Sequence, residues 1–107
     1  MSTNAYLVLV TIDSEEAAAA MARALLESKL IACANIVPRI RSIYSWEGKI
    51  QDDHESLMLI KTTASRMAEI KAEVQRLHSY DTPEVIGFSI DDGLPDYLRW
   101  IEHHVLN

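Results

Sequence analysis

The sequence contains few of the residues that form disulfide bonds and phosphate-binding loops. Its 107 residues include one cysteine, Cys33, so no disulfide can form within the chain. The three glycines, Gly48, Gly87 and Gly93, are spread out, and none belongs to a glycine-rich phosphate-binding loop. No stretch approaches the roughly 20 consecutive apolar residues of a membrane span. These absences exclude a disulfide scaffold, a phosphate loop and a spanning helix, and the lone cysteine favours a reducing cytoplasm.

Positive charge is also scarce, with 10 lysines and arginines against 16 acidic residues and a net charge of −6. An acidic surface repels nucleic-acid phosphates and anionic membranes and attracts cations. We therefore expect neither a nucleic-acid nor a membrane partner. Residues 1–4 do not combine a basic start with an apolar run, so we expect no secretory signal. The length predicts a single domain over residues 1–107.

The first half of the chain predicts a strand, a helix and a long hairpin. Residues 6–12 are apolar on both faces, as in a central strand. Asp13 followed by Glu16 has the spacing of a capping box, which predicts a helix ending at Lys29. Residues 31–46 read as one extended segment, in which Pro38 must lie at an edge, bulge or bend. Glu47 and Gly48 form a turn, and residues 49–61 return as a strand.

The second half predicts a helix, a strand and a short closing helix. A stripe of apolar residues predicts a helix that faces the sheet and is capped by Thr63; the stripe is Met67, Ile70, Val74 and Leu77. Residues 85–90 form the last strand. Pro95 fits the first position of a closing helix whose inward residues are Tyr97, Leu98, Ile101 and Val105. The resulting β-α-β-β-α-β order predicts an α+β ferredoxin-like sandwich, with both main helices on one face of an antiparallel sheet.

One face of that sheet is left without a helix to cover it. Several strands are apolar on both faces, and Tyr44, Trp46 and Trp100 fall outside the stripes that face the helices. An uncovered apolar sheet face is an association surface. The sequence therefore predicts that the protein associates with itself.

No local motif predicts a catalytic site, and we expect that the protein is not an enzyme. Acylphosphatases share the β-α-β-β-α-β order, but Asn35, Arg39 and Arg41 lie in a strand here and not in an anion-binding loop. RNA-binding domains share it too, yet they need a basic face. Cys33 could pair with a histidine as a thiolate, or it could be a small hydrophobe inside an apolar strand.

The histidines offer no metal site that is local in sequence. His103 and His104 are adjacent on a helix, about 100° apart, and cannot hold one ion from one face. His54 is expected to be exposed in the hairpin. His78 ends the second helix, where a protonated imidazole would suit the negative end of the helix dipole. Any metal site must therefore be assembled in space or between subunits.

Polar residues gather at the ends of predicted strands. Lys61 closes one strand and Glu84 opens another, with Tyr80 in the loop between and Trp46 at the hairpin tip. Lys61 and Glu84 could form a simple salt bridge. Alternatively, these residues could line a ligand-binding cleft.

Five motifs along the chain resemble those of the CutA family, the divalent-cation tolerance proteins. They span about Val8 to Ile101 and are Leu30-Ile-Ala-Cys-Ala-Asn-Ile-Val-Pro38, Ser42-Ile-Tyr-Ser-Trp-Glu-Gly-Lys-Ile50, Lys61-Thr-Thr63, His78-Ser-Tyr-Asp-Thr-Pro-Glu84 and Tyr97-Leu-Arg-Trp100. The resemblance implies a PII-like homotrimer whose long hairpin reaches a neighbour. It also implies tolerance to copper and other divalent cations.

The resemblance further implies a ligand cleft between subunits, formed by Cys33, Trp46, Lys61, Tyr80, Glu84 and Trp100. His78 and Cys33 are the candidate ligands for copper or another divalent cation. The chain departs from the family at Ser79, where a proline is usual, and at Val10, where some members have a cysteine. A second hypothesis is a PII-like signalling or anchoring module that binds a partner protein without metal.

Overall fold

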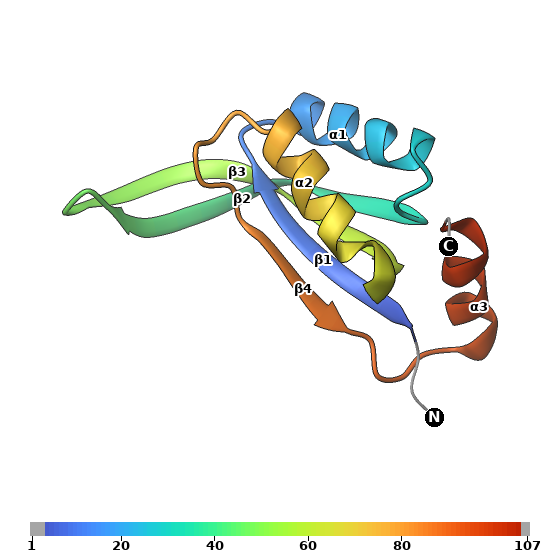
Figure 1. Ribbon diagram of the computed structural model, residues 1–107. Helices are drawn as coiled ribbons and strands as arrows, with labels where there is room; N and C mark the ends of the chain where they lie inside the picture. The colour runs from blue at the N-terminus through green and yellow to red at the C-terminus, as the bar shows by residue number, and fades with distance from the viewer. Residues whose placement is uncertain (1–3, 106–107) are drawn as a thin grey trace.

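A four-stranded antiparallel sheet forms the centre of the protein, seen in a computed structural model that describes residues 4–105 (Figure 1). The strands lie in the order β2-β3-β1-β4. Their bounds are β1 Ala5–Ile12, β2 Cys33–Trp46, β3 Lys49–Thr63 and β4 Val85–Ser89. The predicted ferredoxin-like α+β fold is confirmed. The residues 1–3 on which the prediction about a secretory signal partly rests lie outside the described range.

Two helices, α1 (Glu15–Glu27) and α2 (Met67–Leu77), cover one face of the sheet, and a 3₁₀ turn, η1 (Ala64–Arg66), precedes α2 (Figure 1). The core between these layers is apolar and buried, and its members include Val8, Val10, Leu25, Ile31, Met58, Ile60, Ile70 and Val74. The third helix, α3 (Pro95–His104), packs separately near the start of β1, where Ile101 and Val105 contact Ala5 and Ala32. None of the helices within residues 4–105 is long and apolar enough to cross a membrane.

The caps of the first two helices differ from the sequence prediction. Ser14, and not Asp13, is the N-cap of α1, and its hydroxyl accepts a hydrogen bond of 3.1 Å from the N–H of Ala17. The backbone of Ser14 is extended, which aims its oxygen at the open end of the helix. Thr63 precedes η1 but caps no backbone N–H, because its hydroxyl contacts Ser65 instead.

Two side chains predicted to point inward are exposed. Leu77 is 39% exposed because it is the last residue of α2 and lies beyond the buried pair Ile70 and Val74. Tyr97 is 43% exposed in the first turn of α3, where its hydroxyl lies near Cys33. The inward face of α3 therefore consists of Ile101 and the residues around it.

The predicted long hairpin is present, and it projects from the body of the molecule (Figure 1). Strands β2 and β3 pair from Cys33 opposite Lys61 to Trp46 opposite Lys49. The register shifts between residues 37 and 40, at the predicted irregularity around Pro38. The two-residue turn has positive φ at both Glu47 (51°) and Gly48 (76°), as a type I′ turn requires. The hairpin gives the molecule its longest dimension of 44 Å.

The other sheet face is apolar and has no helical layer over most of its area. Alternation along the strands places six large side chains there, which we call the open face: Leu7, Leu9, Leu57, Leu59, Ile86 and Phe88. The register forms rows across the sheet, such as Leu59, Leu9 and Ile86. Ile86 is 44% and Phe88 48% exposed, whereas Val8 on the helical face is fully buried. The prediction that this chain leaves an apolar sheet face uncovered is confirmed.

Candidate functional site

The residues predicted to share a cleft lie in two groups at opposite ends of the open face. One group lies at the hairpin and the loop before β4, and it contains Trp46, Tyr80 and Glu84. The other lies at the end near α3 and contains Cys33, Lys61 and Trp100. A single chain does not bring the two groups together.

The strand order explains this separation and, within a single chain, excludes the Lys61–Glu84 salt bridge, which was one of the two alternatives. Strand β1 lies between β3 and β4, so the ends of β3 and β4 are not neighbours. Lys61 lies opposite Leu7, near the start of β1, whereas Val85 lies opposite Val10, near the end of β1. Lys61 instead donates a hydrogen bond to the side chain of Asn35.

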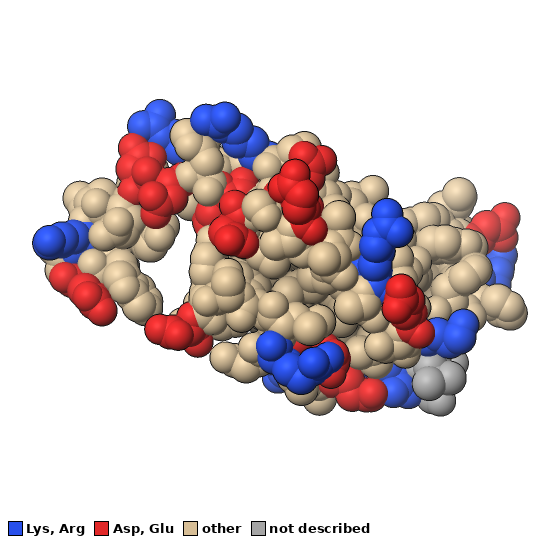
Figure 2. All heavy atoms as spheres, turned by 90° about the horizontal axis from the view of Figure 1, so that it is seen from above, with Lys and Arg blue, Asp and Glu red and all other residues tan. Residues whose placement is uncertain are grey.

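A concave space, the hairpin cavity, lies between the hairpin and the loop that precedes β4. Its volume is about 810 Å³, and its lining includes Tyr44, Trp46, Glu55, Tyr80, Asp81 and Glu84. Seen from above, an opening separates the projecting hairpin from the body, with acidic atoms on more than one side of it (Figure 2). Glu55 lies on β3 and Glu84 directly precedes β4, and both strands contribute to the open face, so the cavity adjoins that face.

One hydrogen bond connects the two sides of the hairpin cavity. The hydroxyl of Tyr80, in the loop, donates to Glu55 of β3 over 3.0 Å. Burial raises the pKa of Tyr80 above its ordinary value, and the hydrogen bond and the negative charge of Glu55 raise it further. Tyr80 therefore stays a neutral donor at physiological pH.

The hairpin wall of the cavity is ordered by two further contacts. Tyr44 donates a hydrogen bond of 2.9 Å to Asp53, and this bond raises the pKa of the phenol. Arg41 binds both carboxylate oxygens of Asp52, at 2.8 and 2.7 Å, and the guanidinium lowers the pKa of that carboxyl. Arg41 is thus the basic group of this wall, and its charge is opposed by Asp52.

His78 has both ring nitrogens engaged by the backbone. Its Nδ1 accepts a hydrogen bond of 3.1 Å from the N–H of Tyr80, and its Nε2 lies 2.6 Å from the carbonyl oxygen of Thr11. Because a carbonyl oxygen only accepts, Nε2 is the donor in the second of these bonds. His78 ends α2 as predicted, but its ring binds the backbone of Thr11 and Tyr80, so no ring nitrogen is free for a metal in this arrangement.

The group at the α3 end is built around aromatic side chains. The sulfur of Cys33 lies 3.7 Å from the hydroxyl of Tyr97, whose pKa is raised by burial and then by Cys33. The rings of Tyr97 and Trp100 stack at 5.6 Å, and His104 packs against Trp100 at 4.8 Å. Cys33 is half-buried on the side of the open face, not sealed in the core.

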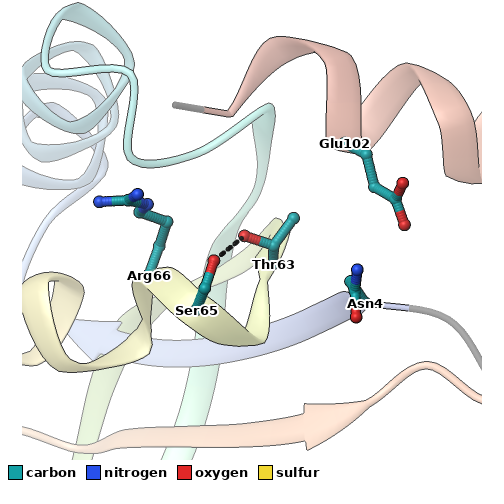
Figure 3. A pocket seen from close by; sticks show the side chains of 5 residues that line it. All are labelled: Asn4, Thr63, Ser65, Arg66 and Glu102. Atoms are coloured by element: carbon teal, nitrogen blue, oxygen red, sulfur yellow. Dashed lines mark hydrogen bonds between the residues drawn. The ribbon is translucent and has the colours of Figure 1, made fainter. Parts of the chain in front are cut away.

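A second cavity, of about 470 Å³, lies away from every predicted site residue. It is lined by Asn4, Thr63, Ser65, Arg66 and Glu102. Glu102 reaches from α3 toward Asn4, while Arg66 extends away from both (Figure 3). Arg66 forms an ion pair with Glu69 at 2.5 Å, and its Nε has no hydrogen-bond partner within the described residues.

Sequence reasoning missed three participants in these sites. Glu55 faces Tyr80, Tyr97 contacts Cys33, and Asn35 bonds Lys61. The sequence could have indicated Asn35, because it lies two residues from Cys33 and therefore on the same face of the strand. The other two contacts join segments far apart in the chain. No group of three or more potential metal ligands from His, Cys, Asp and Glu occurs within residues 4–105.

Fold and site together define an α+β ferredoxin-like sandwich with a projecting hairpin, an open apolar sheet face and an acidic cavity beside it. The model of one protein family, described as CutA1 divalent ion tolerance protein, matches residues 6–104. The chain belongs to this family. The resemblance seen in its motifs is therefore confirmed.

Relatives with known names agree with this assignment. The divalent-cation tolerance protein CutA of Thermus thermophilus is 43% identical over 98 residues, which are 92% of this chain and 95% of that protein. The chloroplastic CutA of Arabidopsis thaliana is 43% identical over 94% of this chain, which spans only 56% of that longer protein. A solved structure described as the periplasmic divalent cation tolerance protein CutA from Archaeoglobus fulgidus has a TM-score of 0.92 at 40% identity, covering 95% of this chain and 99% of that chain.

Proposed function

We propose that the protein is a homotrimer that acts in the response to divalent cations, binding a divalent metal or a small ligand in clefts between its subunits. Copper is the first candidate metal. The protein acts by binding and not by catalysis. Family membership supports the cation response, and the apolar open face is the observation that carries the assembly.

The open face supports association because its side chains are large, apolar and contiguous. The row of Leu59, Leu9 and Ile86 crosses three strands, the next row joins Leu7 to Phe88, and burying such area stabilises an interface by about 25 cal/mol per Å². Sister chains that cover this face would bring the α3 end of one chain toward the hairpin cavity of another. Both predicted groups would then contribute to one cleft.

The assembly is tested with two charge substitutions of matched exposure. Ile86, on the open face, is 44% exposed, and Leu26, on the outer side of α1, is 42% exposed. Light scattering is expected to give three times the chain mass for the wild type and for Leu26→Glu. The Ile86→Glu variant is expected to dissociate and to give the mass of one chain. A wild-type particle with the mass of one chain would overturn the proposal.

The metal part of the proposal depends on Cys33. Its sulfur is a soft ligand that suits copper, and it lies half-buried beside the open face. Titration of Cu²⁺ followed by calorimetry is expected to give saturable heat in the wild type and reduced affinity in Cys33→Ser. If the wild type gives no saturable heat, the metal part of the proposal is overturned and the proposed assembly is unaffected.

A second candidate function is a signalling or anchoring module that binds a partner protein without metal. The observation that favours it is the exposed apolar hairpin tip, where Ile50 is 81% and Trp46 51% exposed. Pull-down from lysate with the wild type and Trp46→Ala discriminates between the two functions. A partner retained by the wild type and lost by Trp46→Ala supports this function, and identical empty lanes count against it.

We place the protein in the cytoplasm, free of nucleic acid and membranes. The single cysteine and the net charge of −6 support this. Fractionation of cells, with detection of the chain by antibody, tests the location. Recovery in the periplasm, where the Archaeoglobus relative is described, would overturn it.

A further inference from the structure

Two side chains of opposite charge lie at the two ends of the open face. Lys61 follows Leu59 by two residues on β3, so it points to the same side of the sheet, at the end near α3. Glu84 precedes Ile86 by two residues, directly before β4, at the end near the hairpin cavity. The apolar rows of the open face lie between these two ends. A chain that covers the face therefore meets a positive charge at one end and a negative charge at the other.

Neither charge has an ion pair within residues 4–105. The ammonium group of Lys61 donates to the side-chain oxygen of Asn35, which is neutral. The carboxylate of Glu84 is exposed and has no hydrogen bond among the described residues. Strand β1 lies between β3 and β4 and keeps the two side chains apart in one chain. A salt bridge between Lys61 and Glu84 can therefore form only between chains.

Cyclic symmetry brings different ends of neighbouring chains together. In a ring of three chains the contact is heterologous, so a patch on one chain meets a different patch on the next. The end of the open face near α3 then meets the end near the hairpin cavity. The signs of Lys61 and Glu84 favour this head-to-tail order, because opposite charges attract and like charges oppose a contact.

We propose that Lys61 of one chain forms an ion pair with Glu84 of the next chain, and that this pair fixes the register of the assembly. Each charge is then balanced inside the cleft between subunits. The apolar rows supply the stability of the contact, and the ion pair selects which ends meet. The inference rests on the proposed homotrimer and deepens it by naming the residues that join its subunits.

Reversal of each charge, followed by reversal of both, tests the pair. Lys61→Glu and Glu84→Lys each bring like charges together, and each is expected to raise the chain concentration of half-dissociation by about tenfold or more. The double variant restores opposite charges and is expected to return to within about threefold of the wild-type value. Light scattering over a dilution series measures these concentrations. The protein is treated with a chelator beforehand, so that a bound metal cannot join the chains.

Two control variants separate the ion pair from the effect of net charge. Lys71→Glu on α2 and Glu27→Lys on α1 change the net charge by the same amounts at exposed positions on the helices. Both are expected to assemble as the wild type does. Where dilution does not dissociate the wild type, melting temperatures at one chain concentration give the same comparison, because assembly stabilises the fold by mass action. Circular dichroism confirms that each variant is folded.

Two results would overturn the inference. One is a double variant that assembles no better than the weaker single variant, and the other is single reversals that assemble as well as the two controls. A wild-type trimer with either result overturns only the ion pair and leaves the proposed function in place. A wild-type particle of two chains, with full rescue in the double variant, supports the ion pair and overturns the trimer.

Discussion

The imidazole Nε2 of His78 lies 2.6 Å from the carbonyl oxygen of Thr11, although 67 residues separate them in the chain. The bond joins the end of α2 to the end of β1. Through Nδ1 the same ring also holds the backbone of Tyr80, the residue that closes one side of the hairpin cavity. His78 therefore sets the position of the loop that carries half of the candidate site.

Replacing His78 by alanine is expected to lower the free energy of unfolding by about 1–3 kcal/mol, because it leaves a buried carbonyl and a loop N–H without partners. Urea denaturation at a fixed chain concentration measures this loss, since an oligomer's stability depends on concentration. His103→Ala is the exposed control and is expected to change stability by less than about 0.5 kcal/mol. Copper affinity is expected to be unchanged in His78→Ala. Loss of copper binding with unchanged stability would contradict this account.

Ser14→Ala is expected to destabilise the protein by about 1 kcal/mol, because the N–H of Ala17 loses its acceptor at the start of α1. Asp13→Ala serves as the matched variant, since Asp13 directly precedes the cap and is exposed. Denaturation curves for both, measured side by side, decide between the two residues. A larger loss for Asp13→Ala would restore the capping box that the sequence predicted.

Gly87→Ala is expected to destabilise the protein by about 1–3 kcal/mol through overpacking. A β-carbon at this position would overlap the ring of Tyr6 and approach the Met67 methyl to 3.1 Å. Thermal melts of Gly87→Ala in the wild-type and Tyr6→Leu backgrounds form a double-mutant cycle. The cost is expected to shrink in the Tyr6→Leu background. Equal costs in both would show that the ring is not the obstacle.

Tyr80 is expected to ionise above its ordinary pKa of about 10, because burial and then Glu55 disfavour the phenolate. A phenol whose folded pKa exceeds its unfolded pKa contributes stability below about pH 10, and this contribution is lost as the pH rises through the folded pKa. The contribution is small because the side chain is only partly buried, so solvent screens its charge interactions.

Ultraviolet difference titration of the wild type against Tyr80→Phe isolates this phenol from the other tyrosines. Glu55→Gln removes the neighbouring charge, so ionisation of Tyr80 is expected to move to lower pH. Circular dichroism over the same range confirms that the chain stays folded. An unmoved titration in Glu55→Gln would contradict the assignment.

Much of the fold follows from local patterns. Apolar runs and alternation with period two identified the strands, and the stripe at helical spacing identified α2. Gly48 marked the turn because that position needs positive φ. Errors were confined to the ends of helices, where Ser14 and Asp13 compete for the same role and a shift of one residue changes few contacts.

The amino-acid order by itself therefore determined the succession of strands and helices and the apolar open face, since these depend on side chains a few residues apart. Tertiary structure alone decided which distant side chains meet. It placed β1 between β3 and β4, which separates Lys61 from Glu84, and it brought Tyr80 to Glu55. Strand order and loop position are set by packing of the whole chain, and no local pattern carries that information.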